Sequence, residues 1–141
     1  MLSGVTARQS STRASWRDKS RRMPPPDMLH YAVTKSAQLT IARGLAQRTR
    51  GTGVTVNAVL PGPTRSEGIV DFLKSVASDP DAPAAELEAE FFRVHRPLSL
   101  LARMIEPDEI AGLVAYLASP LAAATNGASL RVEGGIVPTI A

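Results

Sequence analysis

The chain has 141 residues and a formal net charge of +3 at pH 7, and this length bounds it to one domain with a buried core. It contains no cysteine, which excludes disulfides, thiolate metal ligands and a cysteine nucleophile, and its two histidines are too few to indicate a metal centre. A cysteine-free chain is compatible with the cytoplasm, where we expect it. No run of about 18 apolar residues is present, so we predict no membrane span.

The excess positive charge lies in the first 27 residues. This stretch holds six of the 16 Lys and Arg residues against Asp18 and Asp27, whereas the rest of the chain has 10 basic and 11 acidic residues. It has neither regularly interleaved aromatic residues nor a binding motif, so we expect no nucleic acid or membrane partner. Residues 1–23 are rich in Ser and Arg without periodicity, which leaves a mitochondrial-type presequence, a disordered tail and a non-native start as interpretations.

A long helix is predicted over residues 28–50. Its apolar residues form two adjoining stripes, which are Leu39, Ala42 and Ala46 on one side and Ile41 and Leu45 on the other. A band this wide favours burial on two sides, against a sheet and against a partner subunit. Gly51 and Gly53 end the helix, and the β-branched run 54–60 predicts a parallel strand that is buried on both faces.

Three further helices and a closing strand are predicted beyond Pro61. Short helices are expected over residues 69–76 and 84–96, and the strand over residues 128–132. Residues 106–109 predict a helix start, because acidic residues are favourable in the first turn and Pro is tolerated there. The buried stripe of that helix is expected to be Ile110, Leu113, Val114 and Leu117.

Tyr31 and Lys35 stand four residues apart near the start of the long helix, so their side chains are expected on one face. A tyrosine hydroxyl in water releases its proton only near about pH 10, but a neighbouring ammonium favours the phenolate. Such a pair can move a proton to or from a hydroxyl carbon during hydride transfer, and the ammonium can hold a ribose hydroxyl. The spacing alone also fits a surface pair in which Tyr31 only packs.

Four segments resemble, in order and spacing, the C-terminal half of a short-chain dehydrogenase/reductase. They are Tyr31-Ala32-Val33-Thr34-Lys35-Ser36-Ala37, Val56-Asn57-Ala58-Val59-Leu60-Pro61-Gly62-Pro63-Thr64, Glu109-Ile110-Ala111 to Leu117-Ala118-Ser119, and Asn126-Gly127-Ala128-Ser129-Leu130-Arg131-Val132-Glu133-Gly134-Gly135. The resemblance implies an α/β fold over residues 24–141, as the C-terminal part of a doubly wound, Rossmann-like parallel sheet. Because the similarity begins abruptly near Met23, it favours a non-native origin for residues 1–23.

The resemblance also implies roles for individual residues. Tyr31 matches the catalytic acid/base, and Lys35 matches the residue that activates it and binds the nicotinamide ribose of NAD or NADP. Pro61, Gly62, Pro63 and Thr64 match the family's loop at the carboxyl end of a strand. In the family this loop receives the carboxamide of the nicotinamide. Thr64 would supply a hydroxyl and Pro63 only a carbonyl, since proline has no N–H donor. A plain turn that closes a strand is the alternative for this loop.

The segment 65–97 corresponds to the family's variable, substrate-covering region. Phe91 and Phe92 are expected in the core and His95 in solvent, in preference to roles as substrate contacts. Glu133 stands where the family usually has Asp, and one extra methylene there is expected to have no consequence.

Two parts of the family's active site have no counterpart in this sequence. No pair of glycines has the strand–loop–helix context of a phosphate-binding loop, and the residue that selects NAD or NADP is missing with it. Asp18 stands where the catalytic serine is expected, and the charged flanks of Ser20 do not suit a central strand. Two strands then remain, which is marginal for a sheet, and one face of the long helix is expected to stay exposed.

The sequence therefore predicts a truncated NAD(P)-dependent oxidoreductase that acts on a small alcohol or carbonyl compound through Tyr31. We expect little or no turnover by this chain alone. One alternative is a catalytically inactive interaction module, which forms a homo-oligomer or pairs with a full-length relative. A degraded product without a cooperative melting transition is the other alternative.

Overall fold

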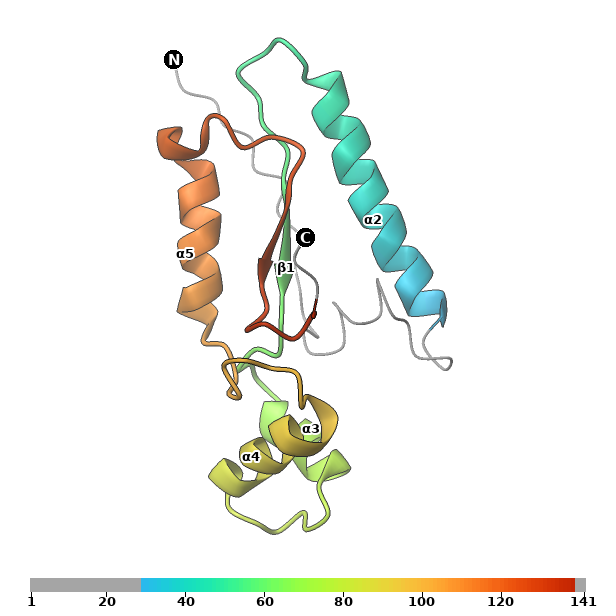
Figure 1. Ribbon diagram of the computed structural model, residues 1–141, viewed down its shortest axis with the longest axis vertical. Coiled ribbons are helices and arrows are strands. Elements are labelled where there is room, and N and C mark those ends of the chain that lie inside the picture. The colour runs from blue at the N-terminus through green and yellow to red at the C-terminus, as the bar shows by residue number, and fades with distance from the viewer. Residues whose placement is uncertain (1–28, 139–141) are drawn as a thin grey trace.

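Residues 29–138 are described by the structure, a computed structural model, and form an elongated α/β arrangement (Figure 1). In chain order its elements are α2 (Leu29–Arg48), β1 (Ala58–Pro61), α3 (Ile69–Val76), α4 (Ala84–His95), α5 (Pro107–Ala118), the 3-10 helix η2 (Pro120–Ala122) and β2 (Ser129–Val132). The predicted α/β class and the four predicted helices are confirmed, with helix ends that differ by one or two residues at most. The predictions for residues 1–23 and for Asp18 lie outside the described residues.

β1 and β2 pair in parallel, as expected for the remainder of a Rossmann-like sheet. The register begins with Ala58 opposite Ser129 and continues to Val132. Beyond the end of β1, Thr64 forms an isolated parallel bridge with Ile105, which lies outside β2. Within residues 29–138 the sheet consists of these two strands. The carboxyl end of β1 thus leads directly into the loop predicted to bind the cofactor.

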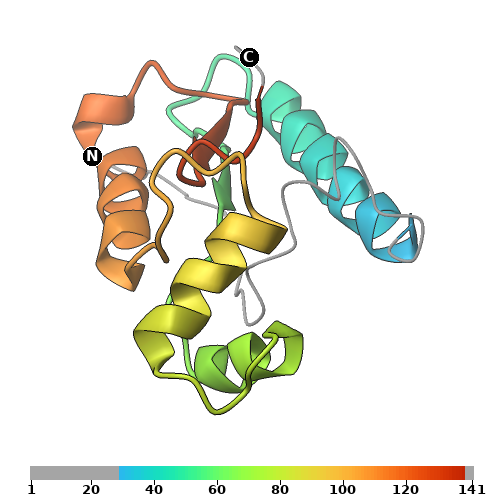
Figure 2. The same ribbon diagram turned by 60° about the horizontal axis from the view of Figure 1, so that its bottom comes forward.

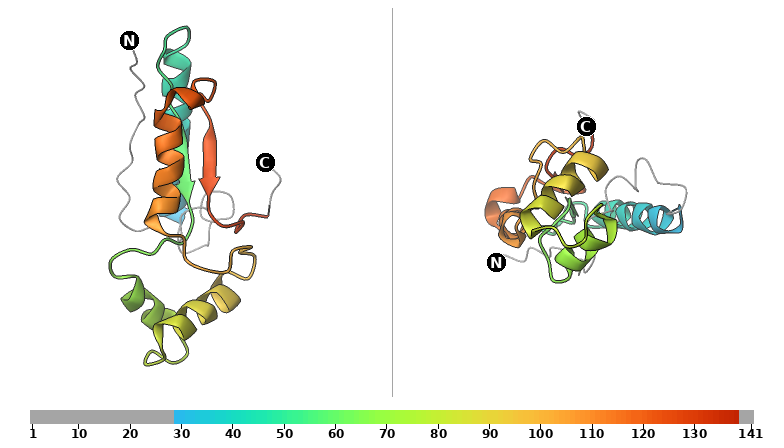
Figure 3. Two further views of the ribbon diagram at one scale, coloured as in Figure 1. Left: turned by 90° about the vertical axis from the view of Figure 1, so that its left-hand side faces the viewer. Right: turned by 90° about the horizontal axis from the view of Figure 1, so that it is seen from below.

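Helices lie on both sides of the strand pair. α5 packs against β2, and α2 runs along the opposite side (Figures 1 and 3). The expected burial of the first strand on both faces is wrong. Leu60 is buried, but Ala58, Val59 and Pro61 are only half-buried. The physical reason is that two strands present a surface too narrow for a helix to cover each face completely.

α2 leaves most of its large apolar side chains in solvent. Its buried residues are Ala32 and Ala46, while Leu39 and Ala42 are half-buried. Leu29, Val33, Ile41 and Leu45 are all exposed. The prediction that one helix face stays exposed is therefore confirmed, and burial of that face against a partner subunit stays a prediction. No helix in the described part of the chain has both the length and the apolar character that crossing a bilayer requires.

A hydrophobic core cluster lies between α3 and α4, which pack side by side in Figure 2. Phe91 and Phe92 are 1% and 4% exposed, and their rings meet edge to face with centroids 5.2 Å apart. The other buried members of the cluster are Leu73, Leu87 and Met104. The predicted core positions of both phenylalanines are thus confirmed.

His95, at the end of α4, is not the solvated residue that was expected. Its ring is half-buried, with the centroid 5.8 Å from that of Phe91 and Nε2 3.2 Å from the carbonyl oxygen of Val76. The adjacent Arg96 is buried, with its guanidinium carbon 5.2 Å from the centroid of the Phe91 ring. Burial lowers the pKa of Arg96. The expectation failed because α3 covers this end of α4, which the periodicity of α4 does not reveal.

The start of α5 is fixed by side-chain hydrogen bonds. Pro107 occupies the first turn, and the backbone N–H of Glu106 donates to Oε2 of Glu109 at 2.8 Å. Both guanidinium nitrogens Nη1 and Nη2 of Arg103 also donate to the Glu109 carboxylate, each at 2.8 Å. Of the predicted buried stripe, Leu117 is buried and the other three residues are half-buried.

Glu109→Gln is expected to change the pH dependence of stability. The hydrogen bonds from Arg103, and then that from the Glu106 N–H, lower the pKa of Glu109 from 4.5 to about 2. A lowered pKa stabilises the folded state fully above the unfolded value, and this stabilisation is lost as the pH falls. Urea denaturation should therefore show a difference between wild type and variant that is constant above pH 4.5 and shrinks towards pH 2. A difference that does not vary with pH would contradict this account.

Candidate active site

Tyr31 and Lys35 lie together on one face of α2. Lys35 Nζ is 5.6 Å from the centroid of the Tyr31 ring, and it donates a hydrogen bond to Oε1 of Gln38 at 3.1 Å. The hydroxyl oxygen of Tyr31 is buried. The four-residue helical spacing produces this geometry, since it brings the two side chains to the same side of the first turns. The Lys35 ammonium thus lies beside the Tyr31 ring, as the spacing predicts.

The loop after β1 is held by its own hydrogen bonds. Thr64 Oγ1 donates to the carbonyl oxygen of Gly62 at 2.9 Å, and the N–H of Ile105 donates to the carbonyl oxygen of Pro63 at 2.8 Å. Thr64 and Pro63 are both buried. Among the hydrogen bonds of residues 29–138, the hydroxyl oxygen and the carbonyl oxygen each keep an acceptor lone pair for a further donor. The loop is therefore a rigid turn with acceptor capacity at the carboxyl end of a parallel strand.

Position 62 requires glycine because the backbone of Glu133 lies close to it. A Cβ atom at this position would lie 2.7 Å from Cα and 2.8 Å from the carbonyl oxygen of Glu133. The Gly62 N–H also donates to the carbonyl oxygen of Val132 at 2.9 Å. The loop thus rests directly on the segment that follows β2, and its position depends on that contact.

Glu133 has a structural role that sequence reasoning missed. Its buried carboxylate oxygen Oε2 accepts hydrogen bonds from the backbone N–H groups of Ile136 and Val137. Gly134 and Gly135 between them have φ values of 68° and 74°, which favour glycine. The acidic residue followed by two glycines was the available signal for a side-chain-stabilised turn. Glu133 therefore orders the turn on which Gly62 rests.

Two asparagines, whose roles sequence reasoning also missed, join the amino ends of the strands. Asn57 Nδ2 donates to the carbonyl oxygen of Thr125 at 2.8 Å, and Asn57 Oδ1 accepts from the N–H of Ala128 at 3.0 Å. Asn126 Oδ1 in turn accepts from the N–H of Val56 at 2.9 Å. An asparagine within a β-branched run was the signal, because asparagine is depleted in strands. These bonds set the register that places the loop after β1.

The two predicted parts of the site lie at the same end of the strands but on separate elements. Figure 1 shows that the start of α2 and the carboxyl end of β1 point towards the same end of the molecule, with α2 to one side. This agrees with the rule that ligands of open α/β sheets bind beyond the carboxyl ends of the strands. In the described part of the chain no group of three or more His, Cys, Asp or Glu side chains could hold a metal ion.

The fold defines the chain as part of a Rossmann-like α/β domain. The sequence model of the family described as Enoyl-(Acyl carrier protein) reductase matches residues 15–137. Together with the relatives below, this match shows that the chain belongs to the short-chain dehydrogenase/reductase family.

Relatives and solved structures agree on this family. The oxidoreductase YvaG of Bacillus subtilis (strain 168) is 46% identical over 118 residues, which cover 84% of this chain and 45% of YvaG. A Serratia marcescens short-chain dehydrogenase/reductase variant is 34% identical with a TM-score of 0.62, covering 87% of this chain and 43% of that structure. An NADPH-bound short-chain oxidoreductase from Pseudomonas aeruginosa PAO1 is 25% identical with a TM-score of 0.71, covering 89% and 44%. The chain spans about half the length of the relatives it matches.

Proposed function

We propose that this chain carries the proton-transfer part of an NAD(P)-dependent oxidoreductase that acts on a small alcohol or carbonyl compound in the cytoplasm. The observation that carries the proposal is the position of Lys35 Nζ, 5.6 Å from the centroid of the Tyr31 ring on the same face of α2. Tyr31 gives its hydroxyl proton to the carbonyl oxygen during reduction and takes the proton back during oxidation. Lys35 favours the phenolate and holds a ribose hydroxyl of the cofactor.

We assign the nicotinamide end of the cofactor to the loop of Pro61, Gly62, Pro63 and Thr64. When bound, NAD or NADP supplies or accepts the hydride. The free acceptor lone pairs on Thr64 Oγ1 and on the Pro63 carbonyl oxygen suit the two N–H donors of a carboxamide. Gly62 lets the loop rest on Glu133, which keeps these acceptors in place. These residues fit only the nicotinamide end of the cofactor. Residues 29–138 contain no glycine-rich turn of the type that binds the pyrophosphate.

The test is hydride transfer measured by NADH or NADPH absorbance with a panel of aldehydes and ketones. We expect little turnover by the chain alone, since the pyrophosphate contacts contribute much of dinucleotide binding. A fusion of residues 24–141 to the part of YvaG outside the matched segment is expected to turn over, and to depend on Tyr31. Turnover by the fusion that survives loss of the Tyr31 hydroxyl would contradict the proposal.

A second candidate function is an interaction module, and the exposed face of α2 favours it. Leu29, Val33, Ala37, Ile41 and Leu45 recur every four residues and are all exposed, which defines the α2 ridge. Side chains spaced by four form the ridges that interdigitate when two helices pack. We propose that a second copy of this chain, or a full-length relative, packs against the α2 ridge.

Ile41→Asp is expected to disrupt such an association. A carboxylate in the middle of an apolar helix contact would be buried without a partner, so the dimer dissociation constant should rise by at least about tenfold. Sedimentation velocity over a range of protein concentrations measures this constant. Leu121→Asp is the matched control, because Leu121 is 82% exposed but lies on η2, away from the ridge. A wild-type chain that stays monomeric at all concentrations would contradict this candidate.

A further inference from the structure

Acidic residues are confined to part of the described chain, whereas basic residues are spread along all of it. Among residues 29–138, every acidic residue except Glu133 lies in the segment 67–109. Residues 29–64 and 110–132 contain no acidic residue, and their basic residues are Lys35, Arg43, Arg48, Arg50 and Arg131. Figure 1 places α3 and α4, within the acidic segment, at one end of the molecule and the carboxyl end of α2 at the other. Among residues 29–138, the arginines near the end of α2 thus form no ion pair with a carboxylate.

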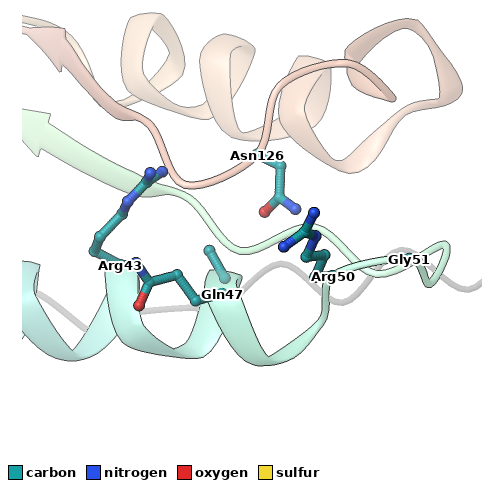
Figure 4. A pocket seen from close by; sticks show the side chains of 6 residues that line it. Arg43, Gln47, Arg50, Gly51 and Asn126 are labelled. Carbon is teal, nitrogen blue, oxygen red and sulfur yellow. The ribbon is translucent and has the colours of Figure 1, made fainter.

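A hollow of about 270 Å³ lies at this basic end, between the last turns of α2 and the segment that precedes β2. Its lining residues are Arg43, Ala46, Gln47, Arg50, Gly51 and Asn126. In Figure 4, Arg43 and Arg50 extend from the α2 side towards the segment that carries Asn126. Pockets for drug-sized ligands begin at about 300 Å³, so this hollow suits a small ligand. It lies at the amino ends of the strands, opposite the end that holds Tyr31.

Arg43 is anchored on one wall of the hollow by a glycine. Its Nη1 donates to the carbonyl oxygen of Gly127 at 3.3 Å. Gly127 has a φ of +71°, and a Cβ atom there would collide with the Arg43 Nη1. The guanidinium therefore occupies space that only glycine leaves open, while its remaining N–H groups stay available to a ligand.

Asn126 adds a neutral donor whose orientation is fixed. Because its Oδ1 accepts from the N–H of Val56 at 2.9 Å, its amide NH₂ is left as the donor beside the Arg50 guanidinium (Figure 4). In the described chain neither Arg43 nor Arg50 forms an ion pair with a carboxylate. The hollow thus offers two cationic donors and one neutral donor, and no acidic side chain of residues 29–138 lines it.

We propose that Arg43, Arg50 and Asn126 bind a phosphate group, either free or esterified to a small metabolite. A phosphate dianion matches two guanidinium charges, and guanidinium geometry suits bidentate contacts with phosphate oxygens. The helix dipole places a partial charge of about −0.5 at the carboxyl end of α2, which disfavours an anion there. The two full positive charges of Arg43 and Arg50 outweigh this partial charge. The site is separate from the redox proposal and holds whether or not the chain transfers hydride.

The test is an NMR titration of the full ¹⁵N-labelled chain at neutral pH with inorganic phosphate, against sodium chloride at equal ionic strength. Saturable shifts are expected at the Gly51 N–H, the Asn126 side-chain NH₂ and the Arg50 Nε–H. A parallel titration with glycerol 3-phosphate distinguishes the two sources, because a phosphomonoester binds only if the hollow is open enough for the ester carbon. Equal effects of phosphate and chloride, or shifts that do not saturate for either phosphate compound, would overturn the proposal.

Arg50→Gln and Arg48→Gln form a matched pair for this titration. Both residues are exposed near the end of α2 and both variants remove one positive charge, but only Arg50 lines the hollow. We expect Arg50→Gln to weaken phosphate binding at least about tenfold and Arg48→Gln to weaken it less than about twofold. Equal weakening by the two variants would show diffuse attraction instead of a site, and would also overturn the proposal.

Discussion

Tyr31→Phe is expected to lower hydride transfer by about a thousandfold in the fusion with the remaining part of YvaG, because a positioned acid/base contributes about 10²–10⁴. The substitution removes one oxygen and leaves the ring that lies beside Lys35 Nζ. The cofactor contacts that we propose for the Pro61–Thr64 loop do not involve the Tyr31 hydroxyl. The loss should therefore fall on kcat, while the dissociation constant for NADH or NADPH, measured by fluorescence, stays within about twofold.

Tyr116→Phe is the natural control for this variant. Tyr116 is the other tyrosine of the chain, is 43% exposed and lies on α5. Removing its hydroxyl is expected to leave kcat unchanged. Equal losses in the two variants would point to a general effect on folding, and an active Tyr31→Phe variant would remove Tyr31 from the chemistry.

Gly62→Ala is expected to lower the free energy of unfolding by about 2–3 kcal/mol. The added methyl would lie 2.7 Å, 2.8 Å and 3.0 Å from three backbone atoms of Glu133. Backbone atoms cannot rotate away as a flexible side chain does, so either the loop or the turn after β2 must move. Urea denaturation followed by circular dichroism measures the change, and a cooperative wild-type transition would also exclude a degraded chain that does not fold.

Gly44→Ala provides the contrast. Gly44 lies within α2, and no atom of residues 29–138 outside its chain neighbours and the surrounding helix backbone lies within 4 Å of the position its Cβ would take. Alanine should therefore raise stability by about 0.5–1 kcal/mol through helix propensity alone. If both alanine variants change stability in the same direction by similar amounts, the contact between Gly62 and Glu133 does not constrain the fold as the geometry indicates.

The helices could be predicted because their signals are local. Residues 69–76 match α3 from end to end, and the acidic, proline-containing stretch 106–109 marks the start of α5. The side-by-side position of Tyr31 and Lys35 also follows from helical spacing alone. A pattern that repeats within a few residues carries this information without knowledge of the rest of the fold.

The remaining features depend on contacts between distant parts of the chain. Asn57 joins the strand ends through partners about 70 residues away, and Glu133 supports Gly62 across the sheet. His95 is half-buried because the end of α3 covers it. Most residues of β1 are only half-buried because α2 does not cover the strand completely. Periodicity describes which face of an element is apolar, but it does not say whether another element is present to cover that face.

The confinement of nearly all acidic residues of the described chain to the segment 67–109 affects how the protein approaches other charged molecules. The charges of residues 29–138 produce an electric dipole, directed from the end that carries α3 and α4 towards the end of α2. The end of α2 attracts an anionic molecule, and the opposite end repels it. The resulting torque orients the two molecules before they come into contact. Salt screens this electrostatic interaction, so at physiological ionic strength its range is only about 8 Å. A lower salt concentration lengthens the range.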